Sequence, residues 1–478
     1  MSDAAPLTDR PVSLLVAVTG DPGTGKTRLL AELAADRLAL GARVEGLLAV
    51  AGPRAAPDKG AAEYRLRILG RDGDLPWAKR DDRIEPPYVF DEETKRRLHE
   101  WAGGLRRAAP AQLLVLDEFG KFEARGEGLM PLWPAFTAAR PQIIVVAVRR
   151  GLAEVIEWKL GRTFDVILDA NAPDTLDRLR GICADYGEWT RLGLYGGAAG
   201  GIEMSAGAAL HAAQVPLRGM AMSSVQAAMM TLAGTGMSRP GRVVWVPFIS
   251  AGLKSLSPAG SRVRPMLAIV MQGLLFGGSV QALGWNVFSV TLGGALVGAW
   301  AAAQGVFLQY LMLGDDLVRS YDTVVRWLAE HTPLTAPSLP VAVGLWALLH
   351  ATAAGSFAFT VHRLRRPPRL LQEVLDRELQ PVPAVAAPRR HGWRRLGEFA
   401  RWQFWLPLIV VVAILRATGG SWEAVGWLAL RFVAVGVVLL ALLSLIRPAR
   451  WAEWLRARGW WGPSLAFASA FEKRTGKQ

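Results

Sequence analysis

Eight residues near the amino terminus, Gly20–Thr27, have the types and spacing of a phosphate-binding loop. Glycines at these places let backbone N–H groups turn toward an anion. Lys26 is then placed to reach β and γ phosphates, and the hydroxyl of Thr27 to bind magnesium. We therefore expect a nucleoside triphosphate as substrate, Mg²⁺ as cofactor, and a catalytic role for Lys26. The predicted nucleotide-binding residues are Gly20, Gly23, Thr24, Gly25, Lys26 and Thr27.

A pair of acids, Asp117 and Glu118, ends an apolar run that begins at Gln112. An aspartate at the end of such a strand can hold Mg²⁺, and the acid beside it can orient and deprotonate an attacking water. The alternative is a strand that ends in a solvated acidic turn. Because the same chain carries Gly20–Thr27, we favour Asp117 as a magnesium ligand, together with Thr27, and Glu118 as a catalytic base.

The elements around these residues predict an α/β domain. A β-branched run, Val12–Thr19, precedes the loop, and a helical pattern over Arg28–Leu40 follows it. Two more apolar runs, Ile143–Val148 and Phe164–Leu168, have strand length, so we expect a parallel sheet with helices on both faces. The pair Arg149–Arg150 follows the first of these two runs. Two alternatives are open: one arginine contacts the γ phosphate, or both arginines are solvated.

Five segments within residues 12–182 share a further pattern: Gly20–Thr27, Gly46–Ala49, Pro87–Phe90, Leu116–Glu123 and Asp169–Asp174. Together they resemble the small P-loop nucleoside-triphosphatase family of the thermophile and cancer-related type. The resemblance implies slow hydrolysis of nucleoside triphosphates without a strict base preference. By position it gives the roles stated above to Gly23, Gly25, Lys26, Thr27, Asp117 and Glu118. Phe119 and Phe122 stand where the family has aliphatic side chains, and both acids are kept.

The rest of the chain predicts an all-α polytopic membrane domain, because 51% of the residues are hydrophobic and only 20% are charged. Apolar runs near the roughly 20-residue length of a membrane span begin after residue 190. Eight are expected, at about 194–213, 219–237, 243–258, 265–283, 287–313, 338–361, 404–418 and 422–446. The expected parts are a cytoplasmic P-loop domain at 1–188, a six-span domain at 190–362, a basic linker at 363–402, a two-span hairpin at 403–447 and a basic tail at 448–478.

The net charge of +14 is explained by basic segments between and after the apolar runs. Cytoplasmic loops accumulate Lys and Arg, which places the linker, the tail and the amino terminus in the cytoplasm. Arg262 and Arg264 would lie in an external loop and count against this orientation. We expect a multi-pass protein of the cytoplasmic (inner) membrane that contacts lipid and not nucleic acid. Residues 315–332 predict an amphipathic helix at the surface, and the single cysteine, Cys183, excludes an internal disulfide.

Ionisable groups at membrane depth are costly and are therefore candidates for function. Glu203, His211 and Lys254 form the predicted solute site, unless Glu203 pairs with Lys254 or an arginine as a structural link. Span number, size and Gly/Ala content make residues 190–362 similar to the substrate-binding components of energy-coupling-factor transporters. A generic helical bundle is the alternative.

Two functions remain open from the sequence. The first is a membrane-bound nucleoside-triphosphatase whose Mg²⁺-dependent hydrolysis powers or gates movement of a small solute, with further membrane or transporter subunits as partners. The second is a membrane-anchored, nucleotide-dependent switch or sensor without transport. An ABC-type mechanism is not supported because no Leu-Ser-Gly-Gly-Gln-like segment is present. A lipid-modifying enzyme is not supported either, because the membrane part shows no candidate nucleophile, metal cluster or carboxylate pair.

Overall fold

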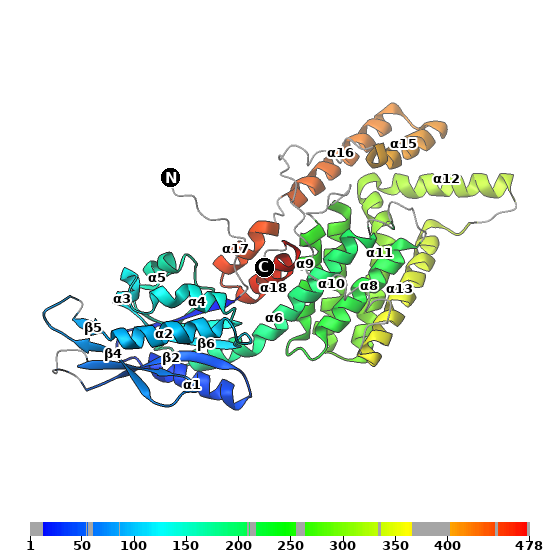
Figure 1. Ribbon diagram of the computed structural model, residues 1–478. Coiled ribbons are helices and arrows are strands. Elements are labelled where there is room, and N and C mark those ends of the chain that lie inside the picture. The colour runs from blue at the N-terminus through cyan, green and yellow to red at the C-terminus, as the bar shows by residue number, and fades with distance from the viewer. Residues whose placement is uncertain are drawn as a thin grey trace. The chain divides into compact units, whose positions relative to one another are not determined.

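The computed structural model describes residues 13–53, 55, 61–85, 87–207, 210, 217–254, 263–332, 336–365, 402–444 and 448–475. The chain divides into two compact units. The first unit comprises residues up to 187 together with 455–465, and the second comprises 188–454 together with 466–477. Figure 1 shows the helices and strands, with labels where there is room.

A mixed sheet forms the centre of the first unit. In the described residues its strands are β1 (Leu14–Gly20), β2 (Val44–Ala51), β3 (Glu63–Ile68), β4 (Asp74–Arg80), β5 (Tyr88–Phe90), β6 (Leu113–Phe119), β7 (Ile143–Arg149) and β8 (Val166–Asp169). They lie in the order β5-β4-β3-β2-β6-β7-β1-β8. Strands β1, β2, β6, β7 and β8 pair in parallel, and one strand, β7, separates β1 from β6.

The prediction of a wholly parallel sheet is wrong for residues 63–90. Strands β3, β4 and β5 add to the edge at β2 as an antiparallel extension. The connection from β3 to β4 is a short turn in which Gly70 and Gly73 have φ of +75° and +83°. A turn of this length can join only antiparallel neighbours, because a parallel pair needs a crossover of about a dozen residues or more.

Helices cover both faces of this sheet, as the sequence predicted. The helices are α1 (Lys26–Ala39), α2 (Glu92–Leu105), α3 (Lys121–Arg125), α4 (Trp133–Ala138), α5 (Ala153–Leu160) and α6 (Thr175–Met204), with a 3-10 turn, η1, at Met130–Leu132. Neighbouring strand residues point to opposite faces, so Leu15 packs with α2, α4 and α5, whereas Val16 packs with α1 and the first turns of α6.

The described part of the second unit is helical. Its elements are the second half of α6, α8 (Arg218–Gly234), η2 (Pro240–Val244), α9 (Trp245–Lys254), α10 (Val263–Leu283), α11 (Val287–Leu313), α12 (Asp315–His331), α13 (Leu339–Leu364), α15 (Trp402–Ala417) and α16 (Trp422–Ser444). Two further helices, α17 (Pro448–Ala457) and α18 (Trp461–Thr475), have residues in both units. The predicted amphipathic segment 315–332 is the separate helix α12.

Three helices among the described residues are long and apolar enough to cross a membrane: Pro265–Leu283, Val287–Leu313 and Leu339–Leu364. They coincide with three of the eight predicted spans. A shorter apolar helix covers Leu408–Ala417. The other predicted spans and the orientation stay predictions, and most of the predicted basic linker at 363–402 lies outside the described residues.

Small residues allow the helices of the second unit to approach closely, as the sequence suggested. A Cβ atom at Gly196 would collide with Ile249 of α9, and one at Gly200 would collide with Leu253. In the same way Gly298 of α11 faces the backbone carbonyl of His350 in α13. Close backbone approach through glycine is typical of helix packing in membranes.

Candidate functional site

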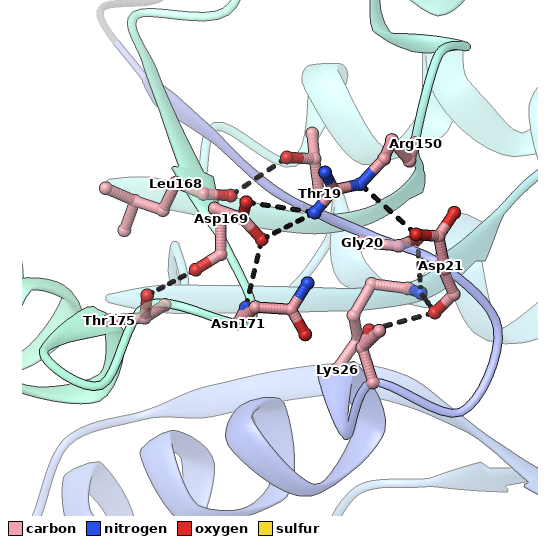
Figure 2. Close-up of polar contacts among 10 residues, drawn as sticks. Thr19, Gly20, Asp21, Lys26, Arg150, Leu168, Asp169, Asn171 and Thr175 are labelled. Atoms are coloured by element: carbon pink, nitrogen blue, oxygen red, sulfur yellow. Dashed lines mark hydrogen bonds and ion pairs between the residues drawn. The ribbon is translucent and has the colours of Figure 1, made fainter.

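The loop between β1 and α1 is held in a turn that depends on glycine. Gly23 and Gly25 both have φ of +84°, in the left-handed region that other residues rarely adopt. Lys26 begins α1, and its Nζ donates to the backbone carbonyl oxygens of Gly20 and Asp21, at 2.8 Å each (Figure 2). The lysine ammonium therefore lies over the loop at the start of the helix.

Asp117 lies beside this loop, although 90 positions separate it from Thr27 in the chain. Its side chain is buried near the side chain of Thr27, and its carboxylate accepts hydrogen bonds from the amide of Ala49 at 3.1 Å and from the amide of Glu118 at 3.0 Å. Burial raises the pKa of Asp117, and these hydrogen bonds oppose that rise. The fold thus brings together the two residues that the sequence predicted as magnesium ligands.

The backbone at the end of β6 is irregular where the site requires it. The register of β6 against β7 shifts between Leu116 and Phe119, which is a bulge at the two acids. Glu118 has φ of +64°, a conformation that costs a non-glycine residue on the order of 1–3 kcal/mol. Bulges beside active sites re-aim a side chain, and here the bulge brings Glu118 to the wall of a recess.

This recess has a cavity volume of about 230 Å³. Solvent reaches Glu118 through it, yet protein surrounds the carboxyl group, and burial, with the charges of Asp117 and Glu123 adding to it, raises the pKa of Glu118 to about 7. Burial also lowers the pKa of Lys26, which the nearby carboxylates oppose. The recess is lined by Lys26, Glu118, Arg149 and the aromatic side chains Tyr64, Trp77, Tyr88, Phe90 and Phe122. We call these five aromatic residues the aromatic wall.

The two arginines at the end of β7 have different surroundings. Arg149 lines the recess with Lys26. Arg150 instead forms ion pairs with Asp169, at 2.9 Å, and with Asp21, at 3.3 Å (Figure 2). Arg150 therefore joins the glycine-rich loop to the end of β8, and Arg149 is the arginine that lies on the side of Glu118.

Glu123 supports the site, although sequence patterns assign it no role beyond its place in the family pattern. Its buried carboxylate accepts from the amide of Gly120 at 2.8 Å and from the amide of Leu129 at 3.0 Å. Gly128, with φ of +62°, lies against the same carboxylate and leaves no room for a Cβ atom. Two features of the sequence could have indicated this role of Glu123: it is an acid between apolar residues, and a glycine follows five positions later.

Residues 455–465 complete the first unit, although the sequence placed them in a basic tail. The buried carboxylate of Asp165 accepts from the amide of Leu15 and from Arg162, both at 2.8 Å, and the Nε of Arg456 lies 2.7 Å away. Trp461 packs against the cluster formed by β1, α1 and α6. No local pattern in the tail predicts these contacts, because their partners lie more than 270 positions earlier in the chain, and those in β1 and α1 more than 400.

The predicted solute site is only partly visible. The Nζ of Lys254 lies 3.6 Å from a carboxylate oxygen of Glu203 and donates to its backbone carbonyl at 2.8 Å. The alternative in which Glu203 pairs with Lys254 is therefore correct as a contact. His211 lies outside the described residues, and within the described residues no cluster of three or more His, Cys, Asp or Glu side chains could hold a metal ion.

The chain thus has an α/β domain at its amino terminus and a helical region in which, among the residues described, three helices could span a membrane. Residues 15–160, from β1 through α5, match a family model described as "Protein of unknown function (DUF2478)". The match covers less than half of the chain and includes the glycine-rich loop, Asp117 and Glu118. No curated protein and no solved structure matches the chain, and neither family that the sequence resembles is named by these comparisons.

Proposed function

We propose that the first unit is a Mg²⁺-dependent nucleoside-triphosphatase with the P-loop architecture and that the chain is membrane-bound. One observation carries the proposal: Lys26, Thr27, Asp117 and Glu118, from two distant segments, lie together at the carboxyl edge of the sheet. Ligands of open α/β sheets bind at this edge. The left-handed glycines of the loop and the start of α1 supply the N–H groups that a phosphate chain needs.

In this proposal each residue has a separate task. Lys26 exchanges the carbonyl oxygens of Gly20 and Asp21 for the β and γ phosphates. Glu118 orients a water in line with the γ phosphate and accepts its proton. Thr27 and Asp117 have the oxygen donors that would hold Mg²⁺, which supplies positive charge against the phosphates when bound. The proximity of their side chains supports this assignment.

The test is phosphate release by the full-length protein in lipid discs, with Mg²⁺ and each of ATP, GTP, CTP and UTP. Glu118→Gln should lower kcat at least 100-fold, because general base catalysis contributes about 10²–10⁴. The matched control is Glu154→Gln, which changes an exposed acid of α5 and should leave turnover unchanged. Wild-type turnover that survives in Glu118→Gln would overturn the assignment of the base.

We further propose that turnover powers or gates movement of a small solute through the second unit. Support comes from the three apolar helices in the same chain. The switch or sensor without transport is the second candidate, and the contact between Glu203 and Lys254 favours it, because two of the three predicted solute residues already bind each other.

The double variant Glu203→Gln/Lys254→Met separates these two candidates in full-length protein. The transport proposal expects NTP turnover to change more than tenfold, which is about 1.4 kcal/mol on the barrier. If the pair is only a structural link, turnover stays within about twofold of wild type once stability is restored by lower temperature. A fragment ending at residue 188 is a poorer test, since it lacks Arg456 and Trp461 of the first unit.

A further inference from the structure

The recess beside Glu118 is larger than a single attacking water requires. An attacking water takes a share of roughly 30 Å³, whereas the recess has a volume of about 230 Å³. Sites for drug-sized ligands occupy about 300–1,000 Å³. The recess therefore has room for a small organic molecule of about one ring in addition to water.

The aromatic wall gives this space a definite shape. Its rings hold one another: Tyr64 and Tyr88 have centroids 5.4 Å apart, and Phe90 lies 4.7 Å from both Trp77 and Phe122. The hydroxyl of Tyr88 is also fixed, because it donates to the carbonyl of Ala61 at 2.8 Å. Flat apolar faces held in place in this way favour a planar ring as ligand.

The aromatic wall comes mainly from the antiparallel extension of the sheet. Four of its five residues come from the antiparallel extension β3, β4 and β5, and Phe122 comes from α3 directly after the acids of β6. The extension thus places aromatic side chains beside Glu118 in addition to lengthening the sheet. Trp77 belongs to the core cluster on one face of the sheet, and Tyr64, Tyr88 and Phe90 pack against that cluster, so the wall lies between the core and the recess.

The recess lies at one particular end of a bound nucleotide. The lysine of a phosphate-binding loop contacts the β and γ phosphates, and here Lys26, Glu118 and Arg149 all line the recess. The γ phosphate therefore faces the recess, and the base and sugar lie at the other end of the phosphate chain. A molecule in the recess is next to the group that is transferred.

We propose that the recess is an acceptor site for a single-ring aromatic or heteroaromatic molecule that carries a hydroxyl group. The inference rests on the proposed nucleotide function. The acceptor oxygen forms a bond to the γ phosphorus while the bond from that phosphorus to the β-γ bridging oxygen breaks. The hydroxyl proton passes to Glu118 and then to solvent, and the nucleoside diphosphate leaves with the bonding electron pair. Water is the competing acceptor, which yields phosphate.

The experiment uses full-length protein in lipid discs with Mg²⁺ and γ-labelled ATP. The probes are benzyl alcohol and 3-pyridylmethanol, and 3-methylpyridine is the matched ring without a hydroxyl. Chromatography separates labelled phosphate ester from labelled phosphate in the same sample. We expect ester with both alcohols and none with 3-methylpyridine.

Variants locate the acceptor. Tyr64→Leu and Tyr88→Leu remove flat faces and should lower the ratio of ester to phosphate at least tenfold. Trp158→Ala removes an exposed aromatic side chain of α5 and should leave that ratio unchanged. Two outcomes would overturn the acceptor site and leave the proposed nucleoside-triphosphatase intact. One is phosphate release without ester from either alcohol. The other is a ratio of ester to phosphate that is the same in all variants. Absence of turnover with ATP, GTP, CTP and UTP alike would instead refute the proposed function itself.

Discussion

The ion pair between Asp165 and Arg456 allows a quantitative test of how residues 455–465 support the first unit. The side chain of Asp165 is 6% exposed and that of Arg456 is 33% exposed. The Nε of Arg456 is 2.7 Å from a carboxylate oxygen, at an angle that makes the contact an ion pair and not an aligned hydrogen bond. Arg456→Met removes the charge and keeps most of the aliphatic length.

The expected cost lies between two known cases. Breaking a fully buried pair costs about 3–5 kcal/mol, because a buried charge is left alone, and an exposed pair is worth about 0–1 kcal/mol. Here Asp165 keeps Arg162 and the amide of Leu15 as partners, and solvent screens Arg456. We therefore expect Arg456→Met to lower the free energy of unfolding of the first unit by about 1–2 kcal/mol.

Cys183 reports this change directly. It is the single cysteine, it is buried, and it lies in α6 within the cluster that Trp461 contacts. When the unit closes faster than the reagent reacts, the alkylation rate follows the population of the open form. A loss of 1–2 kcal/mol should therefore raise the alkylation rate of Cys183 by a factor of about 5–30.

The matched control is Arg178→Met, which changes an exposed arginine of the same helix, α6, and should leave the rate unchanged. In the double variant with Asp165→Asn, the loss should be smaller than the sum of the two single losses, because the two residues are in contact. An Arg456→Met protein whose alkylation rate is within twofold of wild type would refute the argument that the tail stabilises this unit.

Three other outcomes are expected. Gly128→Ala should displace Glu123 from the amide of Leu129 and lower NTP turnover at least tenfold, as phosphate release would show, and normal turnover would contradict it. Lys254→Met should lower the unfolding free energy of detergent-solubilised protein by about 3 kcal/mol, more than Glu203→Gln/Lys254→Met does, since it leaves a buried carboxylate alone; equal losses would contradict it. Burial raises the pKa of Cys183 to about 11 from its ordinary 9.0. The thiol therefore ionises first in the unfolded state, and the free energy of unfolding should fall between pH 9 and 11, by at most about 3 kcal/mol. In denaturation experiments on Cys183→Ser, this fall with pH should be absent.

Local patterns were sufficient for much of the first unit. The order of strand, glycine-rich loop and helix around Gly20–Thr27 could be predicted because the conformation of each element depends on residues that are close in the chain. The strand that ends at Asp117 and Glu118 could be predicted for the same reason, and it corresponds to β6. The antiparallel strands at residues 63–90 depart from the predicted parallel sheet because the short turn at Gly70–Gly73 can join only antiparallel neighbours.

The sequence by itself determined the α/β class of the first unit, the apolar character of three helices and the acids and glycines that suggest phosphate chemistry. Only the tertiary structure decided that Glu118 lies at a bulge against an aromatic wall, and that Arg149, unlike Arg150, lines that recess. It also brought Arg456 to Asp165. The physical reason is that loops and strands follow from local conformational preferences, whereas burial, charge pairing and cavities depend on which distant segments pack together.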